Sequence, residues 1–125
     1  MNVELVTRNK VTVAEIIGDL DHHTAKNMRS EIDREIKEHC SKVLILDFSK
    51  VAFMDSSGIG LIMGRYKLME EMDGEVIVAC PPTYIRKVLN LAGINRLAKI
   101  VSDYSNYFID EKNKESENVE VETNK

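Results

Sequence analysis

The sequence has few cysteines and no long apolar run, and each absence excludes a class of protein. The 125-residue chain contains two cysteines, Cys40 and Cys80, which are too few for a disulfide framework. No run of about 18 apolar residues occurs, so a transmembrane helix is not expected. The amino terminus lacks a basic patch followed by an apolar stretch, so no secretory signal is expected. These absences predict a cytoplasmic protein without a membrane partner.

The chain also has little excess charge outside its carboxyl terminus. The formal net charge is −4, but residues 110–125 carry six acidic and three basic residues, which leaves −1 on residues 1–109. A nearly neutral body gives no electrostatic reason to expect nucleic acid as a partner. From about Lys112 onward the only apolar residues are Val119 and Val121, too few to bury. We therefore expect one domain over residues 1–110 and a disordered polar tail over 111–125.

Hydrophobic periodicity predicts an alternation of strands and helices. Two β-rich runs around a turn at 8–10 predict a hairpin, apolar residues at intervals of three and four predict helices, and short continuous apolar runs predict buried strands. The expected strands are Val3–Thr7, Val11–Ile17, Val43–Leu46, Val76–Ala79 and Ala98–Val101. The expected helices are Thr24–Glu38, one containing Ile59–Met69, one from Pro82 to before Gly93, and one over 103–109. Strand–helix–strand units in series predict an α/β fold, with a mostly parallel four- to five-stranded sheet, an N-terminal hairpin and about four helices.

The segment before the second helix holds the most unusual group of polar residues, Asp55, Ser56 and Ser57, followed by Gly58. It lies in one of three loops, 18–23, 49–57 and 80–83, expected at the carboxyl edge of the sheet, where ligands and partners bind. Aspartate and serine cap helices, but three such residues exceed what one cap needs. We therefore expect a free hydroxyl at the positive end of the helix dipole, where an added phosphate would be tolerated and would alter docking.

Three glycines in this region raise the alternative of a nucleotide site. Gly58, Gly60 and Gly64 miss the dinucleotide fingerprint by one residue, and Arg65 follows Gly64 where a phosphate-binding P-loop has lysine. Gly60 and Gly64 are instead expected to allow close packing of the helix on the sheet, and no cofactor is expected. Arg65 is predicted to lie on a solvated helix face.

The segment before the first helix contains Asp19, Asp21, His22 and His23, which raises the alternative of a metal site or a phosphoesterase. Metal chemistry needs further ligands from other loops, and His39 is expected near the opposite edge of the sheet. No metal is therefore expected. With Asp21 as a helix cap and the histidines solvated, this segment forms an acidic rim beside the serine loop, suited to arginines on a partner.

These motifs, in this order, resemble the STAS domain of bacterial anti-anti-sigma factors. The matching stretches are Leu20–Ala25, Phe53–Gly60 and Gly64–Lys67, and the likeness spans roughly residues 1–110. The serine loop marks the family, and the other two stretches point to its sporulation branch. A ligand-sensing STAS module that binds a nucleotide or lipid at the same edge is the alternative.

The resemblance implies a partner-switching regulator rather than an enzyme. The unphosphorylated form would bind a nucleotide-bound anti-sigma factor, itself a serine kinase, and release the sporulation sigma factor F. The family's phosphorylated serine corresponds to Ser56, and a PP2C-type phosphatase would restore the active form. Ser57 fits a cap or supporting role, and the free protein is expected to be a monomer. Partner contacts are expected at Asp19, Asp21, His22, Asp55, Ser57 and Gly58.

Overall fold

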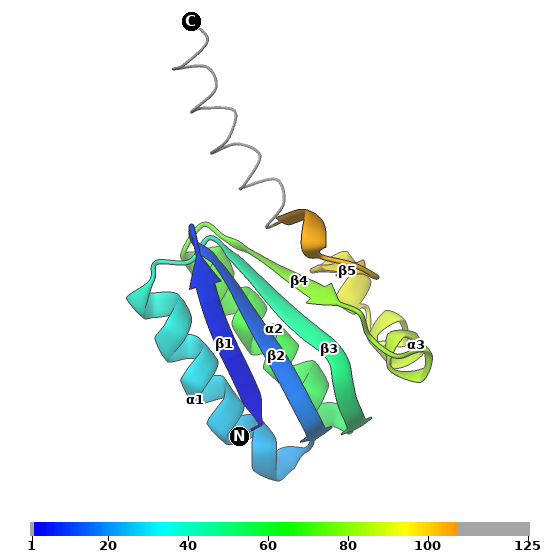
Figure 1. The fold of residues 1–125 in the computed structure, drawn as a ribbon. Helices are drawn as coiled ribbons and strands as arrows, with labels where there is room; N and C mark the ends of the chain where they lie inside the picture. The colour runs from blue at the N-terminus through cyan, green and yellow to red at the C-terminus, as the bar shows by residue number, and fades with distance from the viewer. Residues whose placement is uncertain (1, 108–125) are drawn as a thin grey trace, which may run out of the picture.

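A five-stranded sheet, with its strands in chain order, forms the centre of the protein (Figure 1). The computed structural model describes residues 2–107. The strands are β1 (Val3–Arg8), β2 (Val11–Leu20), β3 (Val43–Met54), β4 (Glu75–Ala79) and β5 (Lys99–Val101). The helices are α1 (His22–Glu38), α2 (Ser56–Glu71), α3 (Thr83–Leu91) and the short 3-10 helix η1 (Ile94–Arg96). Because β1 is antiparallel to β2 and the other pairs are parallel, the predicted α/β fold is confirmed.

Two sequence-based expectations reach beyond the described residues. The polar tail predicted over 111–125 lies outside them. Of the terminal helix predicted over 103–109, residues 105–107 are helical and the last two lie outside the described range. Within residues 2–107, no helix combines the length and apolar character needed to cross a membrane.

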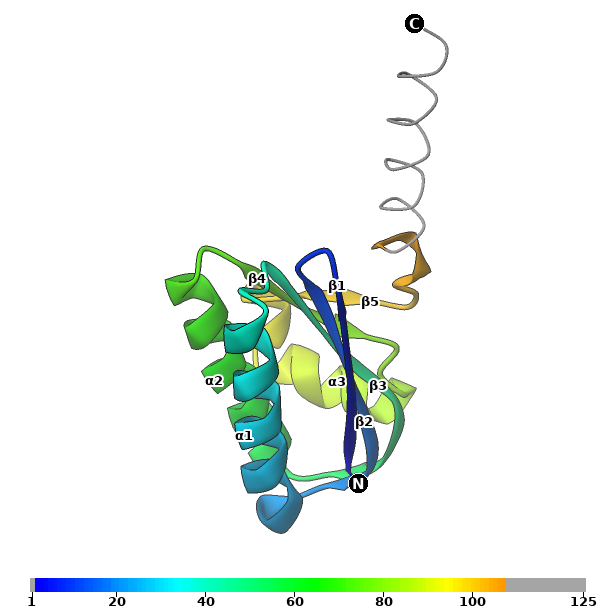
Figure 2. The same ribbon diagram turned by 60° about the vertical axis from the view of Figure 1, so that its left-hand side comes forward.

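The three α-helices pack on one face of the sheet (Figures 1 and 2). Each strand–helix–strand unit steps in the same direction along the sheet, and right-handed crossovers of this kind place every helix on the same side. Ile32, Ile62 and Leu89, one from each helix, share a single buried cluster with Leu44 and Leu46 of β3. This arrangement leaves the other face of the sheet without a helical layer in the described part of the chain.

Residues 102–107 cover part of this second face. Tyr104 and Tyr107 pack against a small apolar cluster formed by Val11, Val13, Ile45, Ile77 and Ala79. The Tyr104 hydroxyl donates a 2.6 Å hydrogen bond to Oδ2 of Asp47, a side chain that is only 4% exposed. Burial, together with the Asp47 carboxylate, raises the pKa of the Tyr104 hydroxyl, so it stays protonated and donates at neutral pH. β3 is thus covered on both faces, as its apolar run predicts.

Tyr104→Phe is expected to lower the free energy of unfolding by about 1.5 kcal/mol, because a buried carboxylate loses a hydrogen-bond donor. Urea unfolding measures this difference. Tyr84→Phe is the matched control, since its hydroxyl donates to the Ala52 carbonyl from a side chain that is 50% exposed. Equal losses for the two variants would contradict a special role for the bond to Asp47.

β2 and β3 run further than predicted, which corrects the expected loops over 18–23 and 49–57. β2 continues to Leu20 and β3 to Met54, and the following helices begin two residues after each strand end. The ladder between them has two register shifts, between Glu15 and Ile17 and between Gly18 and Asp19. Bulges of this kind break the regular alternation of side chains, so the pattern of the sequence conceals the later part of both strands.

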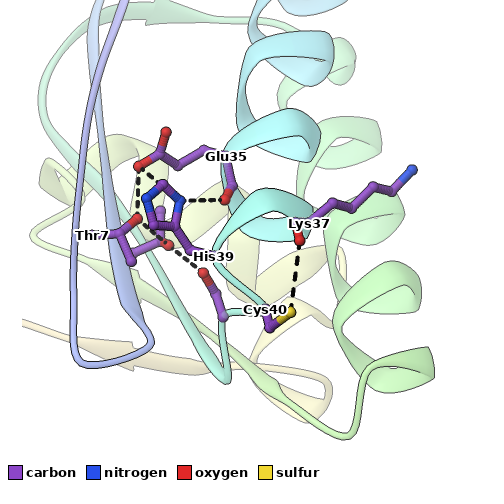
Figure 3. A network of polar contacts seen from close by, with 7 residues as sticks. Thr7, Glu35, Lys37, His39 and Cys40 are labelled. Carbon is purple, nitrogen blue, oxygen red and sulfur yellow. Dashed lines mark hydrogen bonds and ion pairs between the residues drawn. The ribbon is translucent and has the colours of Figure 1, made fainter.

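A polar network joins the end of α1 to the hairpin, at the edge opposite the predicted site (Figure 3). The Thr7 hydroxyl donates to Oε2 of Glu35 at 2.7 Å, and Nδ1 of His39 lies 2.9 Å from the Glu35 carbonyl oxygen. His39 caps the end of α1, so about 25 Å of helix separates it from Asp21. The predicted distance between His39 and the other histidines is therefore confirmed, and no group of three metal-binding side chains occurs among residues 2–107.

Arg65 is buried, so its predicted place on a solvated helix face is wrong. Its side chain is 6% exposed, and Nε lies 2.7 Å from Oδ1 of Asp33. Burial lowers the pKa of the guanidinium group, and the Asp33 charge opposes that shift. The ion pair joins α1 to α2, and spacing along either helix alone cannot reveal a partner on the other.

Candidate functional site

The ends of β2 and β3 bring the predicted site residues together. Leu20 pairs with Met54 in the parallel ladder, and the backbone N–H of Asp55 donates to the Leu20 carbonyl at 3.2 Å. Asp21 follows Leu20 and Asp55 follows Met54. Because neighbouring strands lie about 4.8 Å apart, the two aspartates start two helices side by side. Figure 1 shows both strands ending at the same edge of the sheet.

Asp21 caps α1, as predicted. Its Oδ1 accepts hydrogen bonds from the backbone N–H groups of Thr24 and His23, at 3.0 and 2.9 Å. The Thr24 hydroxyl accepts in return from the Asp21 N–H at 3.0 Å, which completes a capping box. The bond from the Thr24 backbone is the main cause that lowers the pKa of the Asp21 carboxyl, with a smaller contribution from His23. Asp21 therefore carries a fixed negative charge at the start of α1.

Asp55 caps α2, and this corrects the capping role considered for Ser57. Oδ1 of Asp55 accepts from the Ser57 backbone N–H at 2.7 Å. Ser57 is thus part of the helix rather than its cap, with a half-buried side chain.

Ser56 is the first residue of α2 and is exposed. Within the part of the chain that the structure describes, no hydrogen bond occupies its hydroxyl. The predicted free hydroxyl at the positive end of a helix dipole is therefore Ser56. A phosphate on this oxygen would lie at a helix start that favours negative charge, so it would not disturb the fold.

Gly58 lies in the first turn of α2 and is buried against the ends of β2 and β3. A Cβ at this position would overlap the Met54 side chain and lie 3.2 Å from Cδ2 of Leu20. A Cβ at Gly60 or Gly64 would meet no atom within 4 Å, so the predicted close packing at those two glycines is wrong. Only Gly58 of these three glycines is in close contact, with the Met54 side chain at the end of β3.

Gly58→Ala is expected to lower the free energy of unfolding by about 1 kcal/mol. The added methyl group must displace Met54, which costs more than the helix gains from alanine. Gly64→Ala is the matched control, because the same change in open space stabilises a helix by up to about 1 kcal/mol. Thermal unfolding measures both effects, and a stabilised Gly58→Ala would contradict the close contact.

The remaining predicted contact residues surround the two caps. Asp19 is exposed, and its carbonyl oxygen accepts a 2.8 Å hydrogen bond from the Thr24 hydroxyl. His22 and His23 are exposed, as expected, with their ring centroids 5.6 Å apart. Asp19, Asp21 and Asp55 therefore lie at the carboxyl ends of β2 and β3, the sheet edge at which Ser56 begins α2.

The third predicted loop, 80–83, forms a separate small cavity of about 350 Å³ next to β5. Cys80 has a positive φ of 57°, and its thiol donates to the Ser102 carbonyl at 3.1 Å. Burial raises the pKa of this thiol, and the charges of Asp47 and Asp103 raise it further. The Cys80 thiol is therefore held protonated and hydrogen-bonded.

Two basic residues near the site were missed by the sequence interpretation. Lys26 and Arg29 line a groove of about 490 Å³ between α1 and α2, together with His22 and Ser57. Residues 22, 26 and 29 are four and three positions apart, a spacing that places them on one helix face. That spacing could have revealed a basic face next to the serine.

The fold and the site define a class of small α/β domain, with helices on one face of the sheet and an exposed serine at a capped helix start beside three aspartates. The STAS domain family matches residues 2–106, and the chain belongs to this family.

Known proteins of similar sequence and structure carry related descriptions. The chain is 33% identical over 106 residues to an anti-sigma F factor antagonist of Paenibacillus polymyxa, which covers 85% of this chain and 88% of that protein. It superposes with a TM-score of 0.74 and 28% identity on the anti-sigma factor antagonist SpoIIAA in its unphosphorylated form, covering 90% of this chain and 96% of that one. For phosphorylated SpoIIAA, a Bacillus cell fate determinant, the TM-score is 0.68 with 29% identity, over 87% and 97% of the two chains.

Proposed function

We propose that this protein is an anti-sigma factor antagonist that switches partners through Ser56. Its unphosphorylated form binds the nucleotide-bound anti-sigma factor, which is also a serine kinase, and thereby releases the sporulation sigma factor F. Phosphorylation of Ser56 ends the interaction, and a PP2C-type phosphatase reverses it. The protein acts by binding in the cytoplasm, as a monomer when free, and catalyses no reaction itself.

The observation that carries this proposal is the exposed Ser56 hydroxyl at the start of α2. A kinase must bring the γ-phosphate of ATP into line with the serine oxygen, which requires an accessible hydroxyl at an edge of the substrate. The half-buried Ser57 side chain is less accessible. The relatives support the same function, since one is named as an antagonist of anti-sigma factor F and another has a phosphorylated form.

The electrostatics of the site support release after phosphorylation. A phosphate adds a charge of about −1.5 to −2 at neutral pH. It would join Asp19, Asp21 and Asp55, whose charges already occupy this edge. A partner surface that accommodates the aspartates must then accept a much larger negative charge, which opposes renewed binding.

Phosphate mapping tests the assignment of the site. The protein is incubated with its cognate kinase and ATP, and the modified residue is identified by mass spectrometry. We expect modification at Ser56 in the wild type and in Ser57→Ala, and none in Ser56→Ala. Modification at Ser57 alone, or no modification in the wild type, would refute the proposal.

A further inference from the structure

The groove between α1 and α2 is open because small residues form its walls. It has a volume of about 490 Å³ and is lined by Ala25 on α1 and by Ser57 and Gly60 on α2. A Cβ at Gly60 would have no atom within 4 Å, so the wall at that point is bare. α1 and α2 run side by side on the same face of the sheet (Figure 2), and the groove lies between the first two turns of each helix.

The groove between α1 and α2 carries positive charge. Lys26 and Arg29 are exposed and line it, and no acidic residue lines it. Among residues 2–107, neither cation has a carboxylate within ion-pair distance. Two unpaired cations beside a cavity favour an anionic occupant.

The Arg65–Asp33 ion pair explains why Arg29 has no counter-ion. Asp33 lies four residues after Arg29 on α1, the usual spacing for a pair along one helix. Its carboxylate instead contacts Arg65 Nε at 2.7 Å. Burial is the main cause that lowers the pKa of Arg65, and the positive charge of Arg29 lowers it further, so the two cations lie near the same carboxylate. Arg65 forms the ion pair with Asp33, so Arg29 lines the groove without a carboxylate partner among the described residues.

The groove also adjoins the switch site. Ser57 lines it, and Ser57 directly follows Ser56. The basic groove therefore lies next to the acidic edge formed by Asp19, Asp21 and Asp55. A partner that covers Ser56 must meet both surfaces, and only a partner with acidic groups opposite the groove avoids burying Lys26 and Arg29 unpaired.

We propose that this α1–α2 groove receives acidic side chains of the anti-sigma factor, with Lys26 and Arg29 as their counter-ions. This inference rests on the proposed function and extends the docking surface beyond the serine and its aspartates. The two opposite charges set the orientation of the partner, because a rotated partner would place like charges together. The groove thus determines the correct alignment of Ser56 with the bound nucleotide.

A charge-reversal series on the full chain tests this proposal. Binding to the anti-sigma factor is measured with ADP present, at low and high salt, for the wild type and for Lys26→Glu/Arg29→Glu. We expect the double variant to lose at least about 100-fold in affinity, since like charges then meet across the interface. Its binding should also weaken less as salt rises. Arg34→Glu/Lys37→Glu, with the same change in net charge on exposed positions of α1 outside the groove, should change affinity by less than about threefold.

The outcomes separate this proposal from the one on which it rests. If the wild type binds and the groove variant binds within threefold of it, the groove assignment is overturned while the proposed function stands. If the wild type itself neither binds the anti-sigma factor nor is phosphorylated, both proposals fall. Calorimetry with ATP or GTP alone forms the last arm. Saturable nucleotide binding that the groove variant loses would assign the groove to a free nucleotide and overturn the proposal.

Discussion

Ser56→Asp is expected to lower the affinity for the anti-sigma factor by at least about 100-fold while leaving the fold intact. The new carboxylate joins three aspartates at the same edge, so the partner meets an excess of negative charge. The fold tolerates the change because the position is the first residue of α2, where the helix dipole favours an acid. Pull-down and calorimetry with ADP measure the binding, and thermal unfolding measures the stability.

Ser56→Asn provides the matched control for this prediction. Asparagine has nearly the shape of aspartate without its charge, so we expect Ser56→Asn to keep most of the affinity and to resist phosphorylation. Ser56→Ala should likewise bind and escape inactivation. If Ser56→Asp bound as tightly as the wild type, the electrostatic account of release would be wrong. If Ser56→Asn also failed to bind, shape rather than charge would control docking.

Asp33→Ala is expected to lower the free energy of unfolding by about 3 kcal/mol, the largest effect on stability that we predict. Arg65 would then remain buried without its counter-ion, at a side-chain exposure of 6%. The partial exposure of Asp33, at 24%, places the loss at the lower end of the range for broken buried pairs. Urea unfolding measures the effect, and Glu38→Ala, at an exposed position of the same helix, should change stability by less than about 0.5 kcal/mol.

A double variant distinguishes a lost attraction from an unpaired charge. In Asp33→Leu/Arg65→Met both charges are removed and apolar groups fill the space, so we expect most of the lost stability to return. If Asp33→Ala and the double variant were equally unstable, the ion pair itself would stabilise the contact between α1 and α2. If Asp33→Ala had no effect on stability, the prediction would be wrong, because Arg65 would then bind water or another group in place of Asp33.

The fold was largely predictable because its signals are local. The periodicity of α1 and the apolar runs of β3 and β4 reflect which side chains face the core, so α1, β4 and the start of β3 were found close to their true positions. The later part of β3 was missed because two bulges against β2 disturb the alternation, and Lys50 falls within the strand. The starts of α1 and α2 were placed late, because residues 22–23 and 56–57 were assigned to loops although they belong to the helices.

The candidate site was predictable where chemistry depends on neighbours in sequence. Asp21 and Asp55 cap the helices that they precede. In the sequence, the two serines differ only in position: Ser56 is the first residue of α2 and Ser57 is the second. The burial of Arg65 and the close packing of Gly58 depend on contacts with other elements, which spacing along one helix does not reveal. The spacing of Lys26 and Arg29 indicates a basic face on α1, but the groove is formed by α1 and α2 together, so the sequence alone does not reveal it.

The order of strands in the sheet has a consequence for how the chain is made. Each strand pairs with the strand synthesised before it, so the sheet grows at one edge and no later strand must be inserted between earlier ones. The parallel pairs join residues far apart in sequence, such as Val11 with Val43, so they form more slowly than the hairpin of β1 and β2. The segment ending at Glu71 already contains both capped helix starts and Ser56. We therefore expect the switch region to assemble on the ribosome before β4 and β5 emerge, with the Tyr104 contact closing the domain last.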